Sequence, residues 1–223
     1  MSIAKYIDHT VLKPTTSLED IEKVCTEASQ YGFAAVCLPP YFVLAASGIL
    51  KGTQIKIATV IGFPFGYNHY LAKAVETEEA ITDGANEIDV VMNIAAFKNK
   101  DFQYLEKEVE NILSISKTAN TLLKIIIETG LLSNEEIIKC CELYKNYPVD
   151  FLKTSTGYAE KGASVEAVSL MRQHLPDQIK IKASGGIKTF EFANALINAG
   201  ATRLGCSASV AIVNGEDSNA GGY

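Results

Sequence analysis

Features that mark membrane, secreted and nucleic-acid-binding proteins are missing from the sequence. No apolar run reaches the roughly 18 residues that a membrane-spanning helix needs, and the N-terminal segment MSIAKYIDHT contains no secretory apolar stretch. Lysine and arginine number 20 against 26 aspartates and glutamates, which gives a net charge of −6. Without a basic excess, neither nucleic acid nor an anionic membrane is an expected partner. We therefore expect a cytoplasmic protein.

Paired cysteines and clustered metal ligands are also missing. None of the five cysteines forms a CxxC pair, and an odd number of cysteines without a secretory segment is typical of free thiols in a reducing cytoplasm. The three histidines, His9, His69 and His174, lie far apart in the sequence. Because a zinc site requires several clustered ligands, we expect no metal and no other cofactor.

The length of 223 residues allows one domain and leaves little room for a second. With 48% hydrophobic and 21% charged residues, the composition is that of a folded globular chain rather than a disordered one. An α/β barrel takes roughly 200–250 residues as a single unit, so it would use almost the whole chain. Residues 214–223, NGEDSNAGGY, are polar and glycine-rich, and they predict a flexible tail after a barrel over 1–213.

Eight short apolar runs alternate with helix-like segments along the chain. They are nearly continuous rather than alternating, as expected of strands that are covered on both faces. The runs occupy residues 6–12, 33–39, 55–62, 86–93, 122–129, 150–156, 179–185 and 202–209. The intervening segments carry helix signals, such as Ser17 before acidic residues with Gly32 at the end, and Ser133 or Asn134 as the cap before two glutamates.

Alternating strands and helices predict parallel βαβ units. Eight units in 223 residues leave about 28 residues for each, close to the minimum for a right-handed βαβ crossover. We therefore predict an α/β fold with a closed (β/α)8 TIM barrel as a single domain. An open, doubly wound sheet is the alternative, but the count of eight strands and the absence of a GxGxxG turn argue against it.

An unusual charge interrupts the sixth apolar run. In DFLKTSTG, Lys153 follows Phe151 and Leu152 within a strand that should be buried on both sides. Burial of an unpaired ammonium group is costly and lowers its pKa, and a neutral amine can attack a carbonyl carbon to form a Schiff base. A lysine whose stem packs and whose head reaches a carboxylate explains the run equally well. This run alone leaves both interpretations open.

Two further charges in apolar runs favour an active site. In IKIKASGG, Lys180 and Lys182 share a strand face, and Lys182 lies nearer the C-terminal rim, where barrel active sites are built. Adjacent strands are about 4.8 Å apart, so Lys153 and Lys182 could approach closely and depress each other's pKa. Asp89 in NEIDVVMN is the third inward charge. Such buried acids are more often structural, but three charges in one barrel indicate a site.

Glycine-rich turns are predicted after the seventh and eighth strands. SGGIKT contains Gly185 and Gly186, and LGCSAS contains Gly205 and Ser207. The loops after strands seven and eight of a barrel commonly bind phosphate through backbone N–H groups. Either turn alone is a weak signal, but together they predict a phosphate site and a small phosphorylated substrate.

Four motifs, IDVVMN, FLKTSTG, KASGGI and LGCSAS, resemble in order and spacing those of the deoxyribose-phosphate aldolase family. IDHTVLKP near the start and FAAVCLPP in the second unit extend the resemblance to essentially the whole chain. The resemblance implies a class I aldolase on a TIM barrel that needs no metal. It implies reversible joining of acetaldehyde to D-glyceraldehyde 3-phosphate to give 2-deoxy-D-ribose 5-phosphate, and assembly as a homodimer or homotetramer.

The resemblance also implies roles for single residues. Lys153 would form the Schiff base, Lys182 would lower its pKa and transfer protons, and Asp89 would relay protons. Substrate contacts are implied for Asp8, Cys37, Thr156, Gly157, Gly185, Gly186, Gly205 and Ser207. For Cys37, a buried core thiol is the commoner role of such a residue.

Two places vary within the family pattern. Tyr158 stands where some members have a basic residue after STG, and Lys161 could replace that charge. The chain ends in Tyr223. Some members end in a tyrosine that enters the site and assists proton transfer, while an inert terminus is the other interpretation.

Two other functions fit the predicted fold. A phosphosugar isomerase or synthase would use the phosphate loops without an imine, and a non-catalytic phosphosugar-binding barrel would use them for binding alone. Neither accounts for two lysines and an aspartate directed into one barrel.

Overall fold

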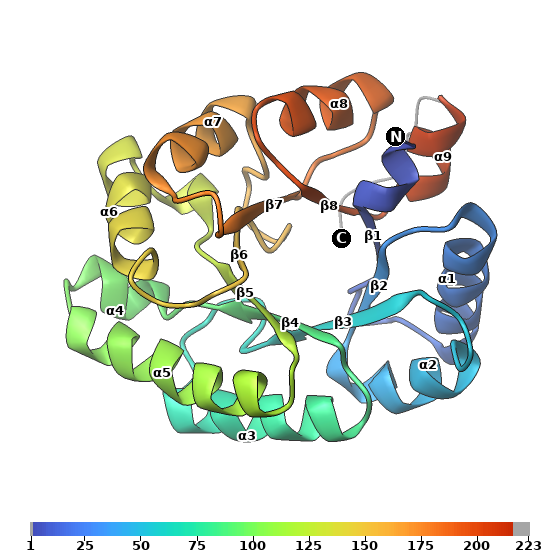
Figure 1. Ribbon diagram of the computed structural model, residues 1–223, viewed down its shortest axis with the longest axis horizontal. Coiled ribbons are helices and arrows are strands. Elements are labelled where there is room, and N and C mark those ends of the chain that lie inside the picture. Colours follow the sequence, from blue (N-terminus) through green and yellow to red (C-terminus); the bar gives the residue numbers. More distant parts are fainter. Residues whose placement is uncertain (1, 216–223) are drawn as a thin grey trace.

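The computed structural model describes residues 2–215 and shows a closed barrel of eight parallel strands (Figure 1). Each strand pairs with the next along the chain, and β8 closes the barrel by pairing with β1. The strands are β1 Ile7–Thr10, β2 Ala35–Leu38, β3 Lys56–Ile61, β4 Glu87–Val91, β5 Leu122–Ile126, β6 Phe151–Lys153, β7 Lys180–Ser184 and β8 Arg203–Cys206. The predicted (β/α)8 barrel is confirmed, and the open doubly wound sheet is wrong.

The strands end earlier than the apolar runs that predicted them. The sixth run continues to residue 156, whereas β6 ends at Lys153, and the eighth continues to Ser209, where α9 begins. The residues just beyond β6 stay buried, including Thr154 and Thr156. Burial therefore continues into the loops at the C-terminal rim, and apolarity does not mark the strand ends.

Helices form the outer layer around the barrel (Figure 1). They are α1 Leu18–Tyr31, α2 Val43–Ile49, α3 Tyr70–Thr82, α4 Ile94–Lys98, α5 Phe102–Thr118, α6 Asn134–Tyr144, α7 Val165–His174, α8 Phe190–Asn198 and α9 Ser209–Asn214, with short 3₁₀ turns η1 Ile3–Tyr6, η2 Pro40–Phe42 and η3 Thr129–Leu131. Ser17 caps α1 by accepting a hydrogen bond from the Asp20 N–H, and Gly32 ends it at φ 66°. Ser133 caps α6 with Glu136 in the same way, so the predicted helix signals are confirmed.

The inside of the barrel is divided into an apolar and a charged part. Leu12 and residues of β2 and β3, among them Ala35, Cys37, Ala58 and Val60, form a small apolar cluster inside the barrel. The buried charged side chains inside the barrel come from the other strands. The main apolar core lies between the strands and the helices. Apolar burial outside the barrel therefore stabilises a fold whose interior can carry polar groups.

Within residues 2–215, no helix is long and apolar enough to cross a membrane. All five cysteines lie in this part of the chain as buried free thiols. The predicted tail 214–223 overlaps α9 at Asn214. Residues 216–223, including Tyr223, lie outside the described residues, so the flexibility of the tail stays a prediction.

Candidate active site

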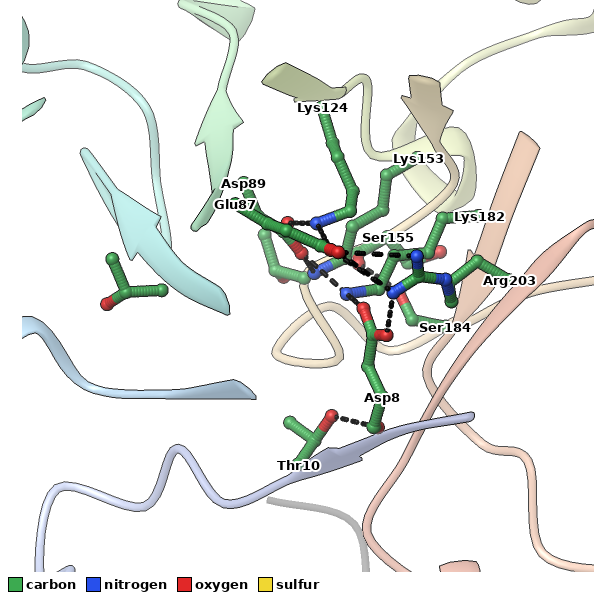
Figure 2. A network of polar contacts seen from close by, with 12 residues as sticks. Asp8, Thr10, Glu87, Asp89, Lys124, Lys153, Ser155, Lys182, Ser184 and Arg203 are labelled. Atoms are coloured by element: carbon green, nitrogen blue, oxygen red, sulfur yellow. Dashed lines mark hydrogen bonds and ion pairs between the residues drawn. The ribbon is translucent and has the colours of Figure 1, made fainter. Parts of the chain in front are cut away.

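Seven ionisable side chains meet inside the barrel (Figure 2). They are the acids and bases Asp8, Glu87, Asp89, Lys124, Lys153, Lys182 and Arg203. Six of these residues are at most 2% exposed, and the side chain of Arg203 is 14% exposed. Charges withdrawn so completely from water are stable only when they are paired, and each of the seven has an oppositely charged partner here.

Asp89 on β4 lies at the centre of the cluster. Its Oδ1 accepts a hydrogen bond from Lys124 at 2.8 Å, and its Oδ2 accepts one from Lys153 at 2.8 Å and one from Lys182 at 2.7 Å. Strand register allows these contacts, because Asp89 pairs with Lys124 and Lys153 pairs with Lys182. Although burial alone would raise it, the three ammonium groups hold the pKa of Asp89 well below its ordinary value. Asp89 is therefore a carboxylate.

Lys182 on β7 donates hydrogen bonds to both Asp8 and Asp89. Although burial alone would lower it, these two carboxylates raise the pKa of Lys182 well above its ordinary value. The prediction that the two lysines depress each other's pKa is therefore wrong for Lys182, because two carboxylates outweigh one neighbouring ammonium group. Lys182 keeps its proton and presents a positive charge beside Lys153.

Asp8 on β1 joins the cluster to β8. Its Oδ1 accepts a hydrogen bond from Arg203 at 2.6 Å, and its Oδ2 accepts one from Lys182. Although burial alone would raise it, Lys182 and Arg203 lower the pKa of Asp8 to about 2. Asp8 is thus a second carboxylate that holds Lys182 in its charged form.

Sequence reasoning missed three members of the cluster. Lys124 lies 2.6 Å from Glu87, and Arg203 lies 3.1 Å from the same carboxylate. A signal existed for two of them, since Glu87 lies two residues before Asp89 on one strand face and Lys124 interrupts an apolar run. Arg203 stands at the start of the eighth run, where a charge is not unusual.

Glu128 was also missed, and it holds the loop after β6. It is 2% exposed and accepts hydrogen bonds from the Thr156 backbone N–H at 3.1 Å and from the Thr156 hydroxyl. Its φ is 54°, a left-handed conformation that is uncommon outside glycine and concentrates at functional sites. Thr156 Oγ1 in turn accepts a hydrogen bond from the Tyr158 N–H at 3.1 Å. Glu128 therefore fixes the loop that follows Lys153.

The rim loops after β6 and β7 touch through glycine backbones. Gly157, Gly185 and Gly186 have φ of 91°, 87° and 76°. A Cβ on Gly185 would lie 3.1 Å from the Cα of Gly162, and a Cβ on Gly162 would lie 2.2 Å from the Gly185 carbonyl oxygen. Only glycine allows this approach. Ser207 is exposed just beyond β8, so the structure brings predicted phosphate residues to neighbouring parts of the rim.

The predicted place of Gly205 in a rim turn is wrong. Gly205 lies within β8 and pairs with Ser184 on β7 and with Asp8 on β1. A Cβ there would lie 2.8 Å from the Cβ of Ser184 and 3.2 Å from the Cε of Lys182. Glycine inside a strand often allows a close approach, and at this position it makes room for Lys182.

The model of the DeoC/LacD family of aldolases matches residues 2–214. This chain belongs to the DeoC/LacD aldolase family. A deoxyribose-phosphate aldolase of Thermoanaerobacter sp. (strain X514) is 49% identical to this aldolase over 214 residues, which cover 96% of each chain. One of Clostridium perfringens (strain 13 / Type A) is 48% identical over 217 residues, covering 97% of this chain and 96% of the relative. The resemblance inferred from the motifs is confirmed.

Solved structures share the fold of this aldolase. The deoxyribose phosphate aldolase of Aeropyrum pernix, described as a unique tetrameric structure, matches with a TM-score of 0.89 at 30% identity, covering 95% of this chain and 89% of that one. The aldolase QR15 matches with a TM-score of 0.90 at 40% identity and covers 95% and 94% of the two chains. The protein is therefore an enzyme, a carbon–carbon lyase on a TIM barrel.

Three other predicted residues of the aldolase, Cys37, Tyr158 and Lys161, are not members of the charged cluster. Cys37 on β2 is fully buried within the apolar cluster of the interior, and burial raises the pKa of its thiol. Tyr158 donates a hydrogen bond to the Leu12 carbonyl oxygen at 2.8 Å and meets the ring of Phe63 edge-on. Lys161 is exposed on the loop between β6 and α7, and its contact with phosphate stays a prediction.

A cleft of about 400 Å³ lies beside the rim of the aldolase. Its lining includes the aromatic side chains of Phe65, Tyr67 and Tyr158. Thr156 and Glu128 also line it. The cleft therefore connects solvent with the loop that follows Lys153.

Proposed function

We propose that this aldolase reversibly cleaves 2-deoxy-D-ribose 5-phosphate into D-glyceraldehyde 3-phosphate and acetaldehyde through a Schiff base on Lys153. The proposal rests above all on one observation: Oδ2 of Asp89 accepts hydrogen bonds from both Lys153 and Lys182. Two carboxylates keep Lys182 charged, and Lys182 thus places a positive charge beside the amine of Lys153. The names of the curated relatives support the substrate.

Imine formation begins with neutral Lys153, whose Nζ attacks the aldehyde carbon C1 of the open-chain sugar. Asp89, 2.8 Å from Nζ, orients the amine. The resulting carbinolamine loses its hydroxyl as water when a proton is supplied, and Lys182 is the proton-bearing group that Asp89 places beside it. The product is an iminium ion, and Lys182 is left as a neutral amine.

Carbon–carbon cleavage uses the iminium ion as an electron sink. The C2–C3 bond breaks, because acetaldehyde retains C1 and C2, and its electron pair forms the enamine. The C3 hydroxyl proton moves to the neutral Lys182 as D-glyceraldehyde 3-phosphate forms. Lys182 then returns this proton to C2 of the enamine. Water hydrolyses the iminium ion, which releases acetaldehyde, restores the neutral Lys153 and gives one proton back to Lys182.

The phosphate end of the substrate is assigned to the rim beyond β7 and β8. Gly185, Gly186 and Ser207 lie there, with Gly157 beside them. Successive backbone N–H groups in segments with positive φ form concavities that bind anions. A contact that binds the ground state and the transition state alike lowers KM rather than raising kcat.

Chemical trapping of the imine tests the proposal. Borohydride reduction in the presence of acetaldehyde or 2-deoxyribose 5-phosphate is expected to leave an adduct on Lys153, located by mass mapping. Lys153→Met is expected to abolish the adduct and to lower kcat/KM by at least about 10³-fold. Lys180→Met is the matched control, because Lys180 lies on the same strand as Lys182 but is exposed. No adduct on Lys153, or full activity of Lys153→Met, would refute the Schiff base.

We also propose that the aldolase is a homo-oligomer, a dimer or a tetramer. Leu71 and Val75 on α3 are 53% and 59% exposed, and Tyr41 on η2 and Leu44 on α2 are exposed as well. Large apolar side chains exposed together often mark protein–protein contacts. Leu71→Glu is expected to lower the mass measured by sedimentation equilibrium, whereas Leu18→Glu, at a similarly exposed site on α1, is not. A monomeric unsubstituted protein would contradict the proposal.

A further inference from the structure

Six of the seven ionisable side chains inside the barrel form a closed ring, most of which is visible in Figure 2. In order, the members are Asp8, Arg203, Glu87, Lys124, Asp89 and Lys182, which returns to Asp8. Neighbours always have opposite charge. Apart from the Lys182–Asp8 contact, the distances between them range from 2.6 to 3.1 Å. We call these six residues the charge ring.

The charge ring is neutral without Lys153. It holds three acids and three bases, and each member contacts two members of opposite sign. Lys153 lies outside the ring and, within residues 2–215, its one ion pair is with Oδ2 of Asp89, which Lys182 also contacts. When Lys153 carries its extra proton, the seven residues together have a net positive charge.

We propose that Glu87 and Arg203, acting through the charge ring, tune the pH at which Lys153 forms an imine, although neither contacts Lys153. This inference rests on the proposed function, because it takes Lys153 as the nucleophile. Charges in a buried site are weakly screened, so the loss of one ring charge changes the potential at Nζ. Glu87 and Arg203 are thus positioning residues with effects of opposite sign.

Substitutions at Glu87 and Arg203 leave the other ionisable groups around Lys153 unchanged. Besides the ring members on β1, β4, β5, β7 and β8, the ionisable groups near it are Cys37 on β2 and Glu128 after β5. Burial raises the pKa of both, and the Glu128 carboxylate is bonded to Thr156. From β3, the interior receives the non-ionisable Ala58 and Val60. Changes at Glu87 and Arg203 therefore isolate the effect of the ring.

The test measures the pH midpoint of imine formation. The adduct formed on Lys153 by acetaldehyde and sodium cyanoborohydride is quantified by peptide mass mapping across a pH series. Glu87→Gln gives the ring a positive net charge, disfavours the ammonium form of Lys153, and is expected to lower the midpoint by about 1 pH unit. Arg203→Gln gives a negative ring and is expected to raise it by about 1 pH unit. The double variant is neutral again and is expected to return to the unsubstituted midpoint.

Opposite shifts with a return in the double variant support the proposal. A purely structural role would lower the trapping rate and the thermal stability without separating the midpoints, and Arg203→Lys, which keeps the charge, is expected to keep the midpoint. If one single variant does not fold, the other single variant and the double variant decide the sign. If the adduct still forms on Lys153 but the pH midpoints of the two single variants shift in the same direction, or do not shift, the proposed role of the ring is overturned. No adduct in the unsubstituted protein overturns the proposed function instead.

Discussion

Asp89→Asn is expected to lower kcat by about 10³-fold and the free energy of unfolding by about 3–5 kcal/mol. Asp89 contacts Lys124, Lys153 and Lys182, so its loss leaves buried ammonium groups short of a counter-ion. The neutral amide also no longer holds the Lys182 proton beside Nζ of Lys153. Steady-state kinetics and urea unfolding measure the two effects.

Glu108→Gln is the matched control for this prediction. Glu108 on α5 pairs with buried Lys73 on α3 at 2.7 Å, outside the barrel. Its loss also leaves a buried lysine unpaired, so a comparable loss of stability is expected, while kcat is expected to change by less than about 3-fold because the pair is not in the site. If Asp89→Asn kept its turnover, or if both variants lost it equally, Asp89 would have only a structural role.

Gly205→Ala is expected to lower kcat/KM by about 10²-fold and the free energy of unfolding by about 1–3 kcal/mol. The added Cβ would lie 2.8 Å from the Cβ of Ser184 and 3.2 Å from the Cε of Lys182. The approach to Ser184 forces β7 and β8 apart locally, because Ser184 is held in β7, and the approach to Lys182 displaces its flexible end and lengthens its contact with Asp89. Kinetics together with thermal unfolding measure the change.

Gly48→Ala separates this packing effect from the general cost of changing a glycine. Gly48 lies in α2, and a Cβ there would meet no atom within 4 Å. Alanine is expected to stabilise the protein at this position by about 0.5–1 kcal/mol, because glycine loses more conformational freedom on folding. Normal kcat/KM in Gly205→Ala would show that the space beside Lys182 is not needed.

The barrel could be predicted because each strand is a nearly continuous apolar run. The runs give the number and order of the strands, but not their ends. Thr154 and Thr156 follow Lys153 and are as buried as the strand itself. The parallel pairing of β6 with β5 and β7 stops at Lys153, and this, rather than a change in burial, marks the end of the strand.

The site could be predicted only in part, because a strand covered on both faces does not show which face points into the barrel. Lys182 and Lys180 share a face, yet Lys182 is buried while Lys180 is exposed. Lys180 is the first residue of β7, and position along the strand therefore determines whether an inward side chain reaches solvent. Lys124 was missed although it stands in an apolar run as Lys153 does. Its partner Glu87 lies on a different strand, and the stagger between strands that joins them is a property of the closed barrel.

The contact between the glycines of the two rim loops fixes the distance between these loops. Gly162 and Gly185 meet backbone to backbone, so neither loop can shift without moving the other. One loop continues the strand of Lys153, and the other is assigned to the phosphate. On the proposed function, the distance between the imine carbon and the phosphate is therefore fixed by the protein. An aldehyde with a longer or shorter chain can occupy either the imine site or the phosphate site, but not both.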